Sequence, residues 1–158
     1  MDTAQETIGA AVGLIPSGCS ILTVADGDRR TGMLVSWVQQ VSFEPPAVSV
    51  CVKRGRPAQD LIDAAGRFVL NIVDENPTPM FKHFGKGFGL DEEAFEGVDV
   101  ASSDHGPVLT ACAGQLGCRV TDKVLAGDHD LYVATVEAAA ASPDARPYVH
   151  LRKSGLTY

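Results

Sequence analysis

The sequence predicts one mainly β domain, an antiparallel barrel with short helices at its periphery. The chain has 158 residues, of which 45% are hydrophobic, and this is enough for one packed core. Six or seven short segments rich in β-branched residues are separated by Gly, Pro and Asp turns. Strands and helices do not alternate regularly, so an antiparallel barrel is favoured over a doubly wound sheet. No linker or repeat divides residues 1–158, which we expect to form a single domain.

The first elements are a helix and a hairpin. Residues 3–12 read as a short helix with an apolar side, ended by Pro16 and Gly18. Residues 20–25 (SILTVA) read as a strand because they are rich in β-branched residues. Asp26-Gly27-Asp28 supplies a turn, and residues 29–35 form the return strand.

The middle of the chain predicts two further strands around a helix. Residues 47–52 (AVSVCV) read as a strand that follows Pro45 and Pro46. Residues 57–65 read as a helix with proline in its first turn and Gly66 after its end. Residues 67–73 (RFVLNIV) form the next strand.

The second half predicts a short helix, a loop-rich region and two strands. Asn76 and Pro77 are expected to cap and open a helix that runs through Phe84. Four glycines between residues 85 and 100 indicate loops. Residues 115–121 alternate between apolar and polar, and residues 131–136 form the strand after the turn GDHD.

Composition excludes several classes of protein. A formal charge of −7 argues against a nucleic-acid binder, which needs a basic face. The acidic start MDTAQET, followed by a run broken by proline and glycine, predicts neither a signal peptide nor a membrane span. The four cysteines form no CxxC or zinc-site pattern, so we expect free thiols in a cytoplasmic protein and no metal site.

Two stretches could bind a ligand through groups other than catalytic acids or nucleophiles. The stretch from Thr31 to Trp37 has a glycine and a serine, so its backbone amides could approach a planar ring; the alternative is an ordinary bent strand. Lys53, Arg54 and Arg56 lie between a strand and a helix start. They predict either a phosphate site or a solvated basic turn.

Two other motifs are less specific. The run GKGFG at residues 85–89 follows a helix and lacks the order of a P-loop, so we interpret it as a mobile loop that carries Lys86 and Phe88. His129 could be an acid/base, a hydrogen-bond donor to a cofactor, or a turn residue. No G-x-S-x-G elbow supports a serine hydrolase.

Five blocks, in order, resemble one family. They are MLVSWVQQVSFEPPAVSV, GRFVLNIV, FKHFGKGFGLDEEAFEGV, AGDHDLYVATV and HLRKSGLTY. Together they make the chain similar to flavin reductase-like, FMN-binding split-barrel domains. The nearest variety is the C-terminal flavin reductase domain of the oxygen-reducing flavodiiron proteins of photosynthetic organisms. Leu34-Val35-Ser36 departs from the Thr-Ala-Ser of many stand-alone reductases.

The resemblance implies a six-stranded Greek-key barrel that binds FMN, or FAD in its place, usually as a homodimer. It also implies hydride transfer from NADH or NADPH to the flavin, with His129 near the flavin or nicotinamide as the candidate catalytic residue. The cofactor-binding residues that the resemblance implies are Met33, Leu34, Val35, Ser36, Trp37, Ser42, Lys53, Arg54, Arg56, Lys86 and Phe88.

Two other functions stay open from the sequence. The chain could be an FMN-containing electron carrier fed by a partner protein, without significant NAD(P)H activity. It could also be a barrel that has lost flavin and binds another ligand. A complete protein of 158 residues would lack the flavodiiron partner domains, so oxygen reduction at a di-iron centre would not be its own activity and its electrons would pass to a separate acceptor.

Overall fold

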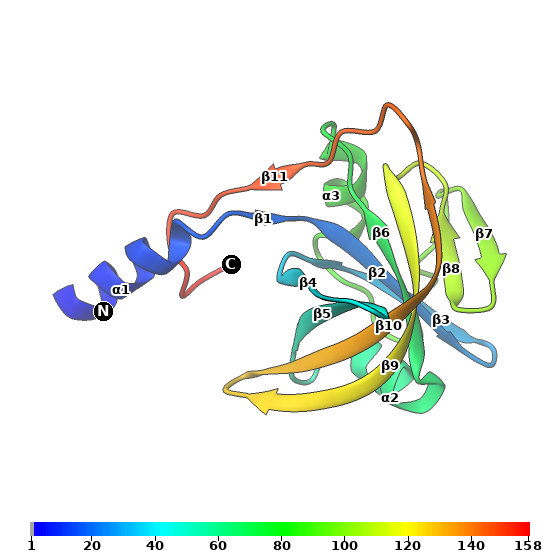
Figure 1. Cartoon of the computed structure of the whole chain (residues 1–158), viewed down its shortest axis with the longest axis horizontal. Coiled ribbons are helices and arrows are strands. Elements are labelled where there is room, and N and C mark those ends of the chain that lie inside the picture. Colours follow the sequence, from blue (N-terminus) through cyan, green and yellow to red (C-terminus); the bar gives the residue numbers. More distant parts are fainter. Residues whose placement is uncertain (1) are drawn as a thin grey trace.

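One antiparallel sheet forms the body of the protein, as a computed structural model that describes residues 2–158 shows (Figure 1). It has seven strands in the order β3-β2-β6-β9-β10-β5-β4, and two small two-stranded sheets, β1-β11 and β7-β8, accompany it. The strands are β1 (Ser17–Gly18), β2 (Ser20–Asp26), β3 (Arg29–Val35), β4 (Val38–Phe43), β5 (Pro46–Lys53), β6 (Arg67–Ile72), β7 (Val100–Ser103), β8 (Gly106–Leu109), β9 (Gly114–Ala126), β10 (His129–Ala141) and β11 (Val149–His150). The predicted mainly β architecture is confirmed, with one more strand in the main sheet than the expected six.

Three short helices flank this sheet: α1 (Thr3–Gly13), α2 (Pro57–Ala65) and α3 (Thr78–Phe84). Asp2 caps α1 by accepting a hydrogen bond from the amide of Gln5. Gly66 ends α2 with φ of 67°, a left-handed conformation that glycine adopts without strain. None of these helices is long and apolar enough to cross a membrane.

Some local predictions need correction. Pro77, not Asn76, is the residue before α3, and no side chain caps that helix. The turn between β9 and β10 consists of Gly127 and Asp128 alone, so His129 already lies in the strand. Strand β4 was not expected, because its sequence VQQVSF does not alternate regularly between apolar and polar, and four of its six residues are exposed.

Two hydrophobic clusters share strand β2. Leu22 and Val24 join the cluster beneath α2, whereas Ile21 joins the cluster around Phe84 of α3. Both faces of the strand are therefore buried, and this accounts for its run of five consecutive buried residues. The two ends of the sheet, β3 and β4, are not paired with each other, so the curved sheet stays open between them.

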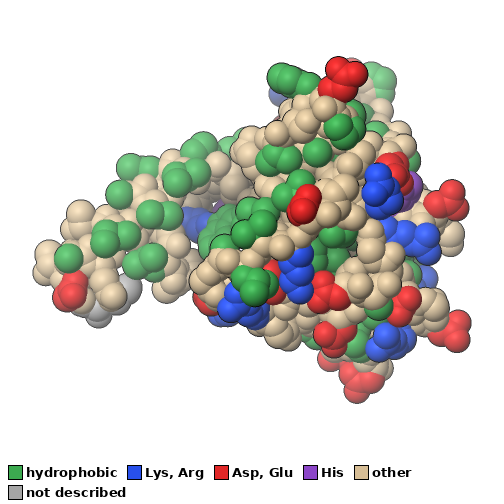
Figure 2. Space-filling view, turned by 60° about the horizontal axis from the view of Figure 1, so that its bottom comes forward, with side chains coloured by type: hydrophobic (Ala, Val, Ile, Leu, Met, Phe, Trp, Pro, Cys, Tyr) green, Lys and Arg blue, Asp and Glu red, His purple; other side chains and the backbone are tan. Residues whose placement is uncertain are grey.

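An arm projects from the sheet on the side of the two termini (Figure 1). We use this name for residues 3–18, which include α1 and β1, and for residues 149–158, which include β11. The last residues pack closely on α1: a Cβ on Gly13 would lie 2.9 Å from the carbonyl oxygen of Arg152, so only glycine allows this approach. Apolar side chains cover much of the arm's surface (Figure 2), and Leu14 and Ile15 are 78% and 68% exposed.

Candidate functional site

A cavity of about 600 Å³ lies where the ends of β3 and β5 meet the arm. Its volume is within the range typical of small-molecule sites, about 300–1,000 Å³. We call it the larger cavity. It is lined by Cys19, Met33, Leu34, Val35, Ser36, Trp37, Cys51, Lys53, Phe81, His129, His150, Leu151, Arg152, Lys153, Ser154, Thr157 and Tyr158. No Asp or Glu of the described chain is in this lining, although the protein carries a net charge of −7.

Trp37 is the central aromatic residue of the larger cavity. It sits between β3 and β4, where its carbonyl accepts a hydrogen bond from the amide of Cys51 at 3.0 Å. Its ring centroid is 4.5 Å from that of His129 and 6.4 Å from that of Tyr158, which it stacks against. Three rings from distant parts of the sequence thus form one aromatic wall.

Both ring nitrogens of His129 have partners. Nδ1 lies 2.7 Å from a carboxylate oxygen of Asp128, and Nε2 lies 2.5 Å from the hydroxyl of Tyr158. A carboxylate only accepts, so Nδ1 carries a proton and donates it to Asp128. The hydrogen bond with His129 lowers the pKa of Asp128, and burial raises the pKa of Tyr158. His129 is held in one orientation and is only 7% exposed.

Arg152 is a cavity residue that sequence reasoning missed. Its guanidinium donates a hydrogen bond to the hydroxyl of Ser36 and lies 5.0 Å from the ring centroid of Trp37. It therefore contacts two consecutive residues that the family resemblance assigns to the flavin ring. The block HLRKSGLTY contains it, but nothing in that block indicates that Arg152 contacts Ser36 and Trp37.

A smaller cavity of about 260 Å³ lies next to the larger one, and Met33 lines both. It is lined by Thr31, Gly32, Met33, Arg56, Pro57, Ala58, Lys86, Gly87, Phe88, Gly89 and Glu92. The first turn of α2 contributes to it, and free amides at a helix N-terminus favour an anion. Thr31 is 1% exposed, and its hydroxyl has no hydrogen-bond partner within residues 2–158.

The structure divides the predicted site residues into three groups. Those in the larger cavity are Met33, Leu34, Val35, Ser36, Trp37, Lys53 and His129. Arg56, Lys86 and Phe88 line the smaller cavity together with Met33, and the ammonium group of Lys86 lies 5.3 Å from the ring centroid of Phe88. Ser42 and Arg54 line neither cavity. The three cations that are adjacent in sequence therefore point to three different places.

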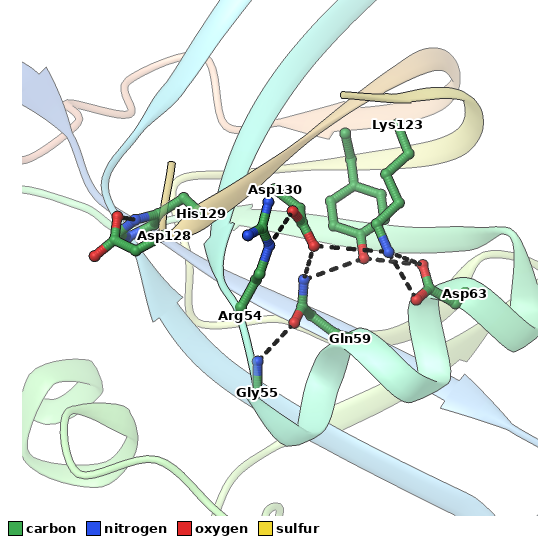
Figure 3. A network of polar contacts seen from close by, with 9 residues as sticks. Arg54, Gly55, Gln59, Asp63, Lys123, Asp128, His129 and Asp130 are labelled. Atoms are coloured by element: carbon green, nitrogen blue, oxygen red, sulfur yellow. Dashed lines mark hydrogen bonds and ion pairs between the residues drawn. The ribbon is translucent and has the colours of Figure 1, made fainter. Parts of the chain in front are cut away.

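Arg54 has a partner inside the protein. Its Nε donates to a carboxylate oxygen of Asp130 at 2.8 Å, and the amide of Gln59 donates to the other oxygen at 2.9 Å (Figure 3). The side chain of Asp130 is buried, so it needs this positive partner. Arg54 thus neutralises a buried acid beside α2, and its side chain is engaged away from the cavities.

No group of three or more His, Cys, Asp and Glu residues in the described chain could hold a metal ion. All four cysteines are free. Burial raises the pKa of Cys19 and Cys112 to about 11 and that of Cys118 to about 12. These thiols are therefore weak nucleophiles at neutral pH.

Comparison with known proteins finds similar chains among flavin proteins. The family model described as flavin reductase like domain matches residues 12–155. The diflavin flavoprotein A 1 of Synechocystis sp. is 36% identical over 151 residues, which are 94% of this chain and 26% of that protein. The chain spans about a quarter of the length of the curated relatives that it matches.

Solved structures agree on the fold. The NADH:FAD oxidoreductase of Streptomyces globisporus has a TM-score of 0.84 at 22% identity, over 90% of this chain and 86% of that chain. The styrene monooxygenase flavin reductase of Pseudomonas putida has a TM-score of 0.77 at 26% identity, over 90% of each chain.

Proposed function

The chain belongs to the flavin reductase-like family, and from this membership we propose that it binds FMN and transfers a hydride to it from NADH or NADPH. The family supports a flavin-related oxidoreductase. The identity of the flavin, the nicotinamide co-substrate and the residues that hold them are our proposal.

The observation that carries the proposal is the charge of the larger cavity. Lys53, Arg152 and Lys153 line it together with Trp37 and Tyr158, and no carboxylate of the described chain does. Aromatic walls suit a planar ring, and uncompensated cations suit negative charge. A flavin ring that becomes negatively charged on reduction meets both requirements.

The smaller cavity fits the phosphate of FMN. The orphaned hydroxyl of Thr31, the first turn of α2, Arg56 and Lys86 supply the donors that a phosphate requires. Because Met33 lines both cavities, one molecule could extend from one cavity into the other. FAD could bind in the same way if its adenosine stayed outside.

Bound flavin would supply the redox chemistry, accepting a hydride at N5 from C4 of the nicotinamide. The chain's own contribution would be to hold and orient the rings. Strand β3 is the last strand of the sheet, so its outer backbone amides have no strand partner and can donate to a ring beside Leu34 and Val35. His129, fixed by Asp128 and Tyr158, would orient the nicotinamide or flavin rather than transfer a proton.

An FMN-containing electron carrier is the second candidate, and one observation favours it. The matched relative is about four times as long as this chain, so a flavin domain of this kind occurs there beside further protein. Electrons could reach this chain from a partner protein, or leave it for one, without significant NAD(P)H activity. We also propose a cytoplasmic location, because the four cysteines are free thiols.

A homodimer is the assembly that we propose. Its support is the exposed apolar surface of the arm, which includes Ile8, Leu14 and Ile15 of the first segment and Leu151 of the last. Apolar patches of this kind mark protein interfaces. The larger cavity lies beside the arm, so a second subunit packed there would border the site.

Spectroscopy of the purified protein tests the proposed function. The protein is mixed with FMN under anaerobic conditions, freed of unbound flavin, and treated with NADH or NADPH. A bound flavin spectrum that either nicotinamide bleaches supports the reductase, and Trp37→Leu is expected to lose most of the bound flavin. Bound flavin that bleaches only with a chemical reductant supports the carrier. A protein that takes up no FMN contradicts both.

A further inference from the structure

Arg152 is a cation without an acidic partner in the larger cavity. Among the ion pairs of residues 2–158, none includes Arg152. Its side chain contacts the hydroxyl of Ser36 and the ring of Trp37, and both groups are uncharged. A guanidinium has five N–H donors, so several remain for a ligand.

The backbone of Arg152 is held in place by the arm. Its carbonyl oxygen packs against Gly13 of α1, where a Cβ would lie only 2.9 Å away. The amide of Gly155 donates to the carbonyl of Gly9 at 2.7 Å, which fixes the same segment three residues further along the chain. The guanidinium of Arg152 therefore reaches the cavity from a segment whose backbone is held against α1.

The positive charge of Arg152 changes the pKa of two neighbouring groups. His150 and Cys19 line the same cavity. Burial and then the positive charge of Arg152 lower the pKa of His150, and the same charge partly offsets the effect of burial on the pKa of Cys19. The cation therefore acts on the interior of the cavity and not only on solvent.

We propose that Arg152 is the residue that stabilises the negative charge of the reduced flavin ring, through its guanidinium beside Ser36 and Trp37. This inference rests on the proposed function. A hydride carries two electrons and one proton, so its transfer turns a neutral ring into an anion and leaves the nicotinamide as its oxidised cation. An unpaired guanidinium stabilises that anion more than the neutral ring, and this difference raises the reduction potential.

Ser36 has a supporting role in this arrangement. Its hydroxyl accepts from Arg152, so it orients the guanidinium across the face of Trp37. Lysine at this position would keep the charge but lose the planar fork that reaches both groups. The charge of Arg152 would therefore set the potential, and its planar fork would fix the direction of the contact.

The test is the two-electron midpoint potential of bound FMN in four proteins: the wild type, Arg152→Gln, Arg152→Lys and Arg146→Met. Glutamine keeps a donor for Ser36 but removes the charge. Arg146 is exposed and lines neither cavity, so its variant is a control for net charge. Circular dichroism and thermal melting establish that each variant is folded, and Arg152→Met replaces Arg152→Gln if glutamine is not tolerated.

A hydrogen bond to a charged group is stronger than one between neutral groups, so its loss should be measurable. We therefore expect Arg152→Gln to bind reduced FMN roughly tenfold more weakly relative to oxidised FMN, a fall of about 30 mV for a two-electron couple. Arg152→Lys should retain most of the wild-type potential, and Arg146→Met all of it.

Two outcomes overturn the inference. One is an Arg152→Gln potential equal to that of the wild type, and the other is an Arg152→Lys potential as low as that of Arg152→Gln. Both leave the proposed function intact, since FMN is bound in each case. A wild-type protein that binds no FMN instead defeats the proposed function, and the inference fails with it.

Discussion

The hydroxyl of Tyr158 lies 2.5 Å from Nε2 of His129, although 29 residues separate the two in sequence. This contact joins the arm to the first residue of β10. It engages one ring nitrogen of His129, while a carboxylate oxygen of Asp128 lies 2.7 Å from the other. Both ring nitrogens of His129 are therefore engaged by neighbouring side chains, and this supports our proposal that His129 orients the flavin or nicotinamide.

The pairing of His129 and Tyr158 can be measured without any ligand. A double-mutant cycle of His129→Ala and Tyr158→Phe should give a coupling of about 0.5–1.5 kcal/mol in the free energy of unfolding, the value of one hydrogen bond. Phenylalanine keeps the ring stacked on Trp37, so the cycle isolates the hydroxyl. Denaturant titration of the four proteins provides the values, and strictly additive effects would show that the contact contributes nothing.

Thr31 should show opposite effects on stability and on ligand binding. Its buried hydroxyl is unpaired, so Thr31→Val should raise the free energy of unfolding of the ligand-free protein by about 1 kcal/mol. The same variant should bind FMN roughly tenfold more weakly, because a charge-assisted bond to the phosphate is lost. Riboflavin, which has no phosphate, should bind both proteins equally.

Thr23 provides the matched control for Thr31. It lies on the neighbouring strand β2, but its hydroxyl donates to the carbonyl of Pro107 and accepts from the side-chain amide of Asn71. Thr23→Val should therefore destabilise the protein by about 1–3 kcal/mol, because it leaves buried polar groups unpaired. Thermal unfolding of both valine variants checks the sign, and a destabilised Thr31→Val would contradict the assignment of a free hydroxyl.

Several elements could be predicted from the sequence because local signals mark their ends. The Asp26-Gly27 turn and the Gly66 cap fixed the bounds of β3 and α2 at the residues that the structure has. Strand β4 and the outer half of β9 were missed. They are mostly exposed, so neither shows the apolar alternation that marks a half-buried strand.

The candidate site was predictable only in part, and the reason is distance along the chain. Ser36 and Arg152 are 116 residues apart, and no local pattern relates them. Nor can sequence say which way adjacent cations point: Lys53 and Arg56 line different cavities, while Arg54 turns to Asp130. The direction of Arg54 depends on the buried carboxylate of Asp130, which comes close to it only when β5, α2 and β10 pack together.

Asp130 should make stability depend on pH in the acidic range. Burial alone would raise the pKa of Asp130, but hydrogen bonds from Arg54 and Gln59 outweigh this effect and lower it. Since the folded-state pKa lies below the ordinary value of 3.8, the stabilisation is present above that value and is lost as the pH falls through the folded pKa.

Asp130→Asn should therefore melt at a lower temperature than the wild type at pH 7, and the difference should shrink as the pH falls below 3.8. Asp60→Asn, on the exposed side of α2, is the control and should follow the wild-type curve. Melting temperatures measured by circular dichroism across this range give the answer. A difference that stays constant with pH would mean that the charge of Asp130 is not the cause.

The cysteines should differ in their reactivity. With pKa values of about 11 to 12, Cys19, Cys112 and Cys118 have roughly one thiolate in a thousand or fewer at pH 8. Cys51 is half-buried and lines the larger cavity. We expect iodoacetamide to label Cys51 first, and FMN to slow this labelling. Peptide mass mapping over time measures both the order of labelling and the effect of FMN. If FMN leaves the labelling of Cys51 unchanged, the flavin does not bind in the larger cavity.

The exposed arm should hold two copies of the chain together. Ile15 is 68% exposed beside Leu14 and Leu151, so a charge there would have to be desolvated in an interface. Ile15→Lys is therefore expected to shift the protein from dimer to monomer in sedimentation experiments, with little change in melting of its secondary structure. Ala101→Lys adds the same charge on β7, on the opposite side of the molecule in Figure 1, and should remain dimeric. A dimer that tolerates Ile15→Lys must use another surface, and a monomeric wild type would exclude the homodimer altogether.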